Sequence, residues 1–423
     1  MRCHPAALSL ILSAALPLTG CAPVELDPAS LPMPTPAPTP APAPVSPYSL
    51  PVDLETLSAA TSAFRRRPAR GDLTGDGLPD HAVGAPLGAR VTVFPSDAAA
   101  PVTLASPLAL FGAALAYVGD LDGDGYPDLA VGAPGADAVA LFAGRPGGVD
   151  PVPRAVIRGA PGSGFGATLA AVGDLDGDGR DDLVIGSVAG HRVSLLRGAR
   201  GGMPTEAGAT YEGPADEGFA SALCPLGDGR VAVALPGEGA VLVLAAQGGA
   251  FTLRARLTVA GTRVLDMGLA ALDANGDGDV DLAVTGGSLG GLVWIRGTAD
   301  GFAAPSPGPT GSGAGTVLAN ATDLDGDGDE ELLLASGAGL WMIPGDPSGQ
   351  LDPVPWSLAR SGSTAALRVV PAQGPGGRAT VLRGVPGEDV AELLGVDRGL
   401  RSVTLLETFT GEAGSAFGAA LAR

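Results

Sequence analysis

A nine-residue aspartate loop recurs along the chain and constrains its fold more than any other feature. In its fullest form it reads Asp-x-Asp-Gly-Asp-Gly-x-x-Asp, over residues 120–128, and an apolar Leu-Ala-Val-Gly-Ala-Pro follows at once. The copies begin at Asp72, Asp120, Asp174, Asp273 and Asp323. Their spacings are 48, 54, 99 and 50 residues. A fixed period of this length indicates that one small unit is copied, as in a propeller or another repeat array.

Two degenerate copies, called worn here because they lack the aspartate loop, bring the number of units to seven. The spacing of 99 residues covers two periods, and residues 219–236 in its middle keep the flanks of the repeat without the aspartate loop. A second worn copy contains residues 378–386, which stand where other copies read Asp-Leu-Ala-Val-Gly-Ala-Pro.

Each unit contains four short apolar stretches bounded by Gly and Pro. In the second unit they are residues 111–116, 129–134, 139–142 and 154–158. Stretches of this kind are typical of strands rather than helices. Four strands make one propeller blade, and an aromatic content of only 4% suits crowded inner strands. The sequence therefore predicts an all-β fold, a seven-bladed β-propeller of four-stranded blades.

The last residues of the chain predict how the ring closes. Residues 415–423 repeat the start of a unit and then stop, while the unit at Asp72 lacks a good first strand. Residues 64–70 hold arginines and a proline where other copies are small and apolar, and proline cannot donate to a ladder. We expect residues 417–421 to complete the first blade beside residues 81–84. The alternative is that the arginine-rich segment itself forms this strand.

The alternating aspartates form a ligand set for a hard cation. Ca²⁺ takes several oxygen ligands at about 2.3–2.6 Å, here the side chains at positions 1, 3, 5 and 9 and the backbone carbonyl at position 7. Two carboxylates ~4 Å apart repel by roughly 4 kcal/mol at an effective dielectric of about 20, so four of them resist closing without a cation. The predicted ligands are Asp72, Thr74, Asp76, Leu78 and Asp80; Asp120, Asp122, Asp124, Tyr126 and Asp128; Asp174, Asp176, Asp178, Arg180 and Asp182; Asp273, Asn275, Asp277, Asp279 and Asp281; and Asp323, Asp325, Asp327, Asp329 and Glu331.

Some loops depart from this pattern, and one other metal motif begins in the same way. Thr74 at position 3 and Glu331 at position 9 replace aspartates. An EF-hand requires Glu at position 12, where the second loop has Val131 inside an apparent strand. The worn units, at Asp228 and near residue 372, have no ligand set, so we expect no metal there. The remaining alternative is that the loops are solvated acidic turns.

The order Phe-Gly, aspartate loop, Gly-Ala-Pro resembles the FG-GAP repeat of integrin α-subunit β-propellers and of many bacterial surface proteins. The resemblance covers roughly residues 62–423 and is closest in the units of Asp120 and Asp174, whereas the unit of Asp72 lacks a clear Phe-Gly. It implies a seven-bladed ring with Ca²⁺ in the turn between the first two strands of a blade. Up to five ions are expected.

The N-terminus predicts export and anchoring. Arg2 and His4 precede an apolar run over residues 6–18, which is too short for a membrane-spanning helix of about 20 residues. It ends in Leu-Thr-Gly-Cys21, which resembles the lipobox of bacterial lipoproteins, in which the cysteine carries lipid. In that family Ala22 after the cysteine implies the outer membrane. An ordinary secretory signal is the alternative.

A proline-rich segment follows the cysteine. Residues 22–51 are dominated by Pro, Ala, Thr and Ser, a composition that adopts extended polyproline II and cannot build a core. We therefore expect a signal peptide over residues 1–20, a lipidated linker over residues 21–60, and the propeller over residues 61–423. The expected location is the outer membrane or surface of a bacterium.

Charge and reactive residues favour binding over catalysis. The chain has 45 Asp+Glu against 25 Lys+Arg and a net charge of −20, which leaves no basic patch for nucleic acid. Outside the signal only His81 and His191 remain, both in apparent strands of different blades, and no serine lies in a nucleophile elbow. Cys224 has no partner for a disulfide in the exported part and is expected to be buried on an inner strand.

We therefore expect a monomeric, non-catalytic binding or adhesion module for a protein or glycan, with Ca²⁺ as its cofactor. This expectation follows the resemblance, because a fold alone does not fix a function. Two alternatives remain. One is an enzyme or enzyme-accessory propeller with a site at the mouth of the central channel. The other is a structural spacer.

Overall fold

The computed structural model describes residues 71–422, except for segments at 97–98, 216–217, 248, 261–262, 265–266, 287–288, 290, 309–316, 325–326, 337–338, 347–355, 359–363, 365, 371–378 and 398–401. Several expectations lie outside the described residues. These are the signal and linker with Cys21, the arginine-rich segment 64–70, and Asp325. No described helix is long and apolar enough to span a membrane.

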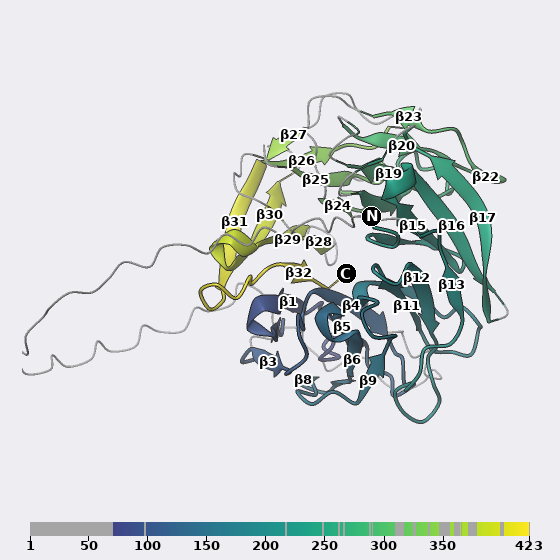
Figure 1. Ribbon diagram of the computed structural model, residues 1–423. Coiled ribbons are helices and arrows are strands. Elements are labelled where there is room, and N and C mark those ends of the chain that lie inside the picture. The colour runs from purple at the N-terminus through teal and green to yellow at the C-terminus, as the bar shows by residue number, and fades with distance from the viewer. Residues whose placement is uncertain are drawn as a thin grey trace, which may run out of the picture. The chain divides into compact units, whose positions relative to one another are not determined.

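Seven four-stranded antiparallel sheets form a ring, which confirms the predicted seven-bladed propeller (Figure 1). Blade 1 consists of β32 (Ala420–Leu421), β1 (His81–Ala85), β2 (Arg90–Phe94) and β3 (Val102–Ala105). Blade 2 consists of β4 (Ala114–Gly119), β5 (Asp128–Ala133), β6 (Ala138–Phe142) and β9 (Ala155–Arg158). Blade 3 consists of β10 (Phe165–Gly173), β11 (Asp182–Ser187), β12 (Arg192–Leu196) and β13 (Thr210–Glu212).

The remaining four blades follow the same order. Blade 4 consists of β14 (Leu223–Gly227), β15 (Arg230–Leu235), β16 (Ala240–Gln247) and β17 (Ala250–Thr258). Blade 5 consists of β18 (Gly268–Leu272), β19 (Asp281–Thr285), β20 (Val293–Ile295) and β23 (Ser306–Pro307). Blade 6 consists of β24 (Val317–Asn320), β25 (Leu332–Ser336), β26 (Gly339–Ile343) and β27 (Trp356–Leu358). Blade 7 consists of β28 (Ala366–Val370), β29 (Thr380–Val385), β30 (Val390–Asp397) and β31 (Ser402–Thr410).

Short elements connect these strands. Two small ribbons pair β7 (Gly144–Arg145) with β8 (Gly148–Val149) and β21 (Gly297–Thr298) with β22 (Gly301–Phe302). One-turn 3-10 helices follow the second strand in four blades: η1 (Pro86–Gly88), η2 (Pro134–Ala136), η3 (Pro236–Glu238) and η4 (Pro386–Glu388). Proline opens each of these turns, because its fixed φ suits the first helical position. The proline of the Gly-Ala-Pro pattern is thus the start of a turn.

The glycines of the repeat form the contact between neighbouring blades. A Cβ on Gly132 in β5 would lie closer than 3.0 Å to the carbonyl oxygen of Gly166, the glycine of the next Phe-Gly, a separation that real Cβ atoms do not show. The φ of Gly166 is +85°, a conformation that favours glycine. The equivalent pairs are Gly84 with Gly112 and Gly384 with Gly418. The repeat therefore needs both glycines, because two backbones meet where they pack.

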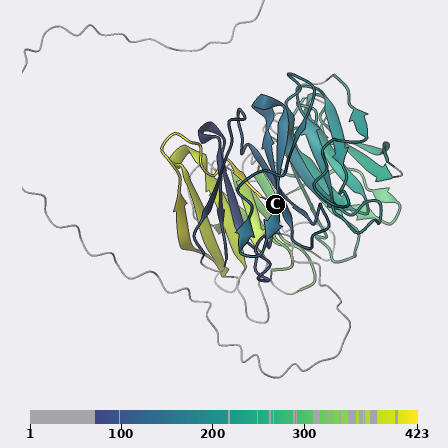
Figure 2. The ribbon, with the colours of Figure 1, turned by 90° about the horizontal axis from the view of Figure 1, so that it is seen from below.

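The C-terminal strand closes the ring as predicted. β32 pairs with β1, with Val83 opposite Leu421, and it contacts both β28 of blade 7 and β4 of blade 2. The paired segment is shorter than expected, but the Gly418 N–H also donates to the Gly84 carbonyl at 2.9 Å. Blade 7, in yellow, lies beside blade 1, in purple, in both views (Figures 1 and 2).

Two reactive residues can now be placed. Cys224 lies buried in β14, an inner strand, as expected. The expectation that His191 lies in a strand is wrong. It precedes β12 in a turn with φ of +50°, because the chain must reverse between β11 and β12 at this point. His81 is the first residue of β1, as predicted.

Candidate metal centres

Each aspartate loop precedes the second strand of its blade, and in blades 2, 3, 5 and 6 it connects that strand to the inner one. The second loop joins β4 to β5, the third joins β10 to β11, and the loop beginning at Asp72 leads into β1, the second strand of blade 1. The loops of blades 5 and 6 take the same place. Since the blades share one strand order, all five loops lie at equivalent positions around the ring.

The first aspartate shapes the loop by accepting its N–H groups. Asp120 Oδ1 accepts the Gly123 N–H at 2.7 Å, and Oδ2 accepts the Gly125 N–H at 3.0 Å. The same pattern recurs at Asp72 and Asp174. At Asp273, Oδ2 again accepts the N–H of position 6, while Oδ1 accepts the N–H of position 5. Backbone donors thus turn inward toward the carboxylate, which fixes the compact turn that a metal site requires.

The ninth residue joins the loop to the blade. Asp128 Oδ2 accepts the Leu121 N–H at 2.8 Å, and Oδ1 accepts the Gly144 N–H at 3.1 Å. The corresponding bonds form at Asp80, Asp182 and Asp281. Asp128 is fully buried. Burial and the charges of Asp122 and Asp124 raise its pKa to about 8.

Burial raises the pKa of the other ninth aspartates too. The pKa of Asp80 and that of Asp281 rise to about 6, with burial as the largest cause. The pKa of Asp182 is raised for the same reason. A buried carboxylate beside further carboxylates costs free energy unless a proton or a cation compensates it. The loops therefore fit a bound cation.

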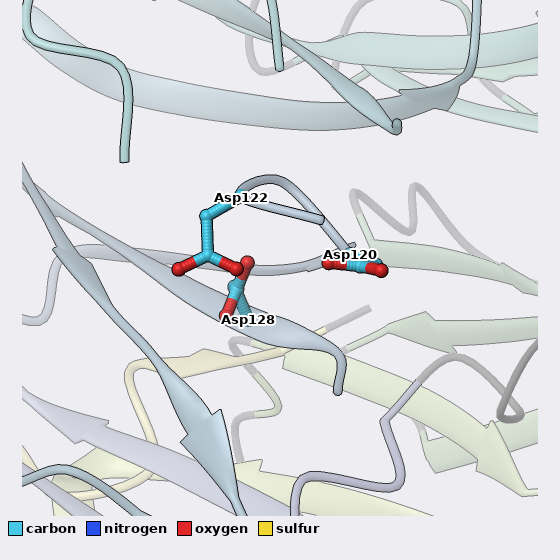
Figure 3. Close-up of side chains that lie close together, drawn as sticks. All are labelled: Asp120, Asp122 and Asp128. Carbon is cyan, nitrogen blue, oxygen red and sulfur yellow. The ribbon is translucent and has the colours of Figure 1, made fainter. Parts of the chain in front are cut away.

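In the described part of the chain, three loops bring three carboxylates together. The ligand oxygens lie within 4.8 Å of one another in the groups Asp120, Asp122, Asp128; Asp174, Asp176, Asp182; and Asp323, Asp327, Glu331. Figure 3 shows Asp122 reaching from its loop toward Asp128, with Asp120 at the side. All these donors are oxygens, the ligands that hard cations such as Ca²⁺ prefer.

The other two loops are less convergent in carboxylates. Their third residues are neutral: Thr74 donates from Oγ1 to Asp72 Oδ1 at 3.3 Å, and Asn275 donates from Nδ2 to Asp277 Oδ2 at 2.8 Å. In this arrangement the amide nitrogen of Asn275, not its oxygen, faces the neighbouring carboxylate. Amide rotation would turn its oxygen inward for a metal.

Two acidic residues that the sequence pattern did not single out also contribute. Asp181 and Glu330 stand at position 8 and accept the backbone N–H of the first aspartate in the preceding blade. The Asp120 N–H donates to Asp181 Oδ2 at 3.1 Å, and the Asp273 N–H donates to Glu330 Oε2 at 2.8 Å. The sequence feature that could have pointed to these two residues is an acidic side chain directly before the ninth ligand. Its partner in another unit was not visible in the sequence.

Arginines contact two loop ligands. Arg180 Nη1 lies 2.6 Å from Asp178 Oδ2, and Arg197 Nη1 lies 3.4 Å from Asp176 Oδ2. Both pairs belong to the third loop. They place positive charge beside two of its four carboxylates, which eases the repulsion among them.

Comparison with known protein families agrees with this geometry. A family model for the FG-GAP-like repeat matches residues 120–185 and 273–334, and one for the FG-GAP repeat matches residues 64–97. This chain therefore carries FG-GAP repeats within a seven-bladed β-propeller. No curated protein matches it.

Solved structures resemble the FG-GAP propeller at low identity. A putative 6-phosphogluconolactonase from Bacteroides fragilis NCTC 9343 is 14% identical with a TM-score of 0.56, over 82% of this chain and 98% of that one. One from Bacteroides uniformis ATCC 8492 is 11% identical with a TM-score of 0.54, over 78% and 96%. A functionally unknown protein from Desulfotomaculum acetoxidans DSM 771 is 11% identical with a TM-score of 0.55, over 81% and 98%. These likenesses show the fold alone.

Proposed function

We propose that this FG-GAP propeller is an exported, calcium-stabilised module that binds a protein or glycan without chemical turnover. Its acidic residues support a structural role for the metal. The carboxylates of the loops accept hydrogen bonds from their own turns. Asp181 and Glu330 accept hydrogen bonds from the loops of the preceding blades. Ca²⁺ at these positions would neutralise the repulsion within each loop, and five ions would halve the net charge of −20.

The observation that carries the binding proposal is a polar hollow beside the second loop. It measures about 300 Å³ and is lined by Asp122, Asp124, Ala143, Gly144, Arg145, Asp150, Arg154, Gly202 and Met203. A second hollow of about 400 Å³ is lined by residues 199–206 and shares Gly202 and Met203 with it. Hollows of this size suit small ligand groups, and carboxylates and guanidinium groups together suit hydroxyl-rich or charged segments of a glycan or peptide.

This proposal is tested by ligand capture with a matched variant. The full chain is immobilised and exposed to a glycan array and to bacterial surface extract, with calcium or with chelator. We expect a bound ligand in calcium and its loss in a double variant Arg145→Glu, Arg154→Glu that keeps the parent melting temperature. The variant Arg192→Glu, at the start of β12 and not among the residues that line either hollow, is the control. Equal capture by parent and double variant would contradict this site.

The described histidines give little support to the enzyme alternative. Burial and the charge of Arg368 lower the pKa of His81 to about 3, and its ring lies 6.4 Å from that of Phe409. With this pKa the His81 imidazole is uncharged near neutral pH and has no proton to give as a general acid. His191 lies on another blade, in the turn before β12. Two structural neighbours are named putative 6-phosphogluconolactonases, and this name describes those proteins rather than this chain.

The anchoring proposal rests on Cys21. Replacing Cys21 with Ser should release the protein from the membrane fraction or block processing of the precursor, because one lipidated residue is the whole anchor proposed. Fractionation and fatty-acid labelling of parent and variant measure this. A variant that still sediments with membranes and labels with fatty acid would show the lipobox interpretation to be wrong.

A further inference from the structure

The seventh side chain of three loops contacts the loop of the preceding blade. In each case it lies over the glycine at position 4 of that loop, 2.7 to 3.0 Å from where a Cβ atom would stand. The three pairs are Gly75 with Tyr126, Gly123 with Arg180, and Gly276 with Asp329. Position 7 was expected to supply a backbone carbonyl only, so this contact between blades is a separate use of its side chain.

Among these three side chains at position 7, Asp329 is the acidic one, and it is buried. A Cβ on Gly276 would lie 2.7 Å from Asp329 Oδ1. The residue is 3% exposed, and its Oδ2 is buried without a hydrogen-bond partner among the described residues. The charges that act on it include those of Asp327, Asp273 and Asp346. A carboxylate buried in these surroundings lacks a compensating charge, which a cation in the adjacent loop would supply.

The residue next to Asp329 holds it in this place. Glu330 donates its N–H to the Asp273 carbonyl at 2.8 Å, and its Oε2 accepts the Asp273 N–H at 2.8 Å. Asn320 Nδ2 donates to the same Oε2 at 2.8 Å. The Asp346 N–H donates to the Ala274 carbonyl at 2.9 Å. Blade 6 is therefore joined to the first two residues of the blade 5 loop, which leaves Asp329 little freedom to turn away.

Arg180 takes the equivalent place with the opposite charge. A Cβ on Gly123 would lie 3.0 Å from Arg180 Nε, which is buried without a hydrogen-bond partner among the described residues. Arg180 is 8% exposed. Asp181, the next residue, accepts the Asp120 N–H. The blade 2 loop thus has a guanidinium group where the blade 5 loop has a carboxylate.

We propose that the side chain at position 7 sets the cation affinity of the loop in the preceding blade, so that Asp329 strengthens the Asp273 site and Arg180 weakens the Asp120 site. The charges of the two loops fit this assignment. The Asp273 loop has neutral Asn275 at position 3, and Asp329 places one more carboxylate beside this loop. The Asp120 loop has carboxylates at all four side-chain positions, and Arg180 offsets one of them. The inference rests on calcium binding but not on the proposed ligand.

The test is calcium binding to the full chain, measured by titration calorimetry and by equilibrium dialysis for stoichiometry. Asp329→Asn keeps the shape of the side chain and removes its charge, and it should weaken one site about tenfold. The same substitution in an Asp273→Asn background, where the blade 5 site is lost, should change nothing further. Asp300→Asn, in the exposed turn of blade 5, removes the same charge elsewhere and is the control.

Arg180→Gln should act in the opposite direction and tighten calcium binding. Part of this gain comes from release of Asp178 in the third loop, so the substitution is repeated in an Asp120→Asn background, where the gain should shrink. Arg192→Gln is its control. Circular dichroism and melting of each variant confirm folding.

Two results would overturn the inference while calcium binding itself stands. Affinities of Asp329→Asn and Arg180→Gln equal to that of the parent would do so. So would an Asp329→Asn effect that persists in the Asp273→Asn background, because the residue would then act on its own loop. A parent chain that binds no calcium would instead overturn the calcium part of the proposed function together with this inference.

Discussion

In each aspartate loop the ninth side chain is buried, while the fifth is exposed. Asp128 is fully buried, yet it remains in a loop with Asp122 and Asp124. Its two oxygens accept N–H groups from the loop and from Gly144 in the ribbon beyond β6. These bonds favour the charged carboxylate, but burial outweighs them, and its pKa rises to about 8. The metal-free loop therefore favours a proton where the loaded loop favours a cation.

The stability of the metal-free protein should depend on pH in an unusual direction. Between its ordinary pKa of 3.8 and about 8, Asp128 holds a proton in the folded state that the unfolded chain has released. Since the folded state then binds more protons, the free energy of unfolding falls as pH rises through this window. Thermal melting in chelator should therefore rise when the pH is lowered from 8 to 5.

Calcium should reverse this trend, because the metal takes the place of the proton and binds better as the carboxylates ionise. Asp128→Asn is the matched variant: it should melt higher than the parent in chelator at pH 8 and lower than the parent in calcium. Melting that is identical at pH 5 and pH 8 in chelator would show that the buried carboxylates are compensated in another way.

At the scale of elements, the blade is a four-stranded sheet, and glycines that recur from unit to unit form its contact with the next blade. The strands, the loops and the number of blades could be predicted from the sequence, because period and alternation act within one unit. The contacts of Asp181, Glu330 and Asp329 could not, since they depend on how adjacent units stack. The wrong placement of His191 in a strand has a similar cause. The pattern of apolar residues does not reveal that the residue before β12 adopts a left-handed turn conformation.

The glycine contact between blades predicts a large effect from one methyl group. Gly132→Ala should destabilise the propeller by about 1–3 kcal/mol, because the new Cβ meets the backbone of Gly166, which cannot rotate away like a flexible side chain. Chemical denaturation of the full chain in calcium measures this. Gly387→Ala is the control, since a Cβ there meets nothing within 4 Å. Equal loss in both variants would show that glycine backbone entropy, rather than contact between blades, causes the effect.

For the whole molecule, the closing seam joins the two ends of the described chain. Phe417 is 2% exposed, and its ring centroid lies 6.4 Å from that of Phe94. Arg368 in β28 donates to the Asp80 carbonyl at 2.6 Å and to the Tyr117 hydroxyl at 3.1 Å. Blade 7 therefore contacts blades 1 and 2 through side chains as well as through β32. The fragment of a repeat at the end of the sequence was sufficient to predict this closure, because an unfinished unit needs a partner.

Deleting residues 416–423 should open the ring. The deletion leaves the β1 edge at Val83 and Gly84 without its partner strand and exposes the cluster that buries Phe417 and Leu421. Loss of a buried aromatic residue alone costs about 3–5 kcal/mol, so the truncated chain should melt at a lower temperature, less cooperatively, or aggregate through its free edge. Glu412→Gln is the control at the same seam, because it removes only an exposed ion pair with Arg90, whose contribution is about 0–1 kcal/mol. If the truncated chain melts like the parent while the control is unchanged, β32 does not hold the ring closed, and the side-chain contacts of blade 7 would have to do so alone.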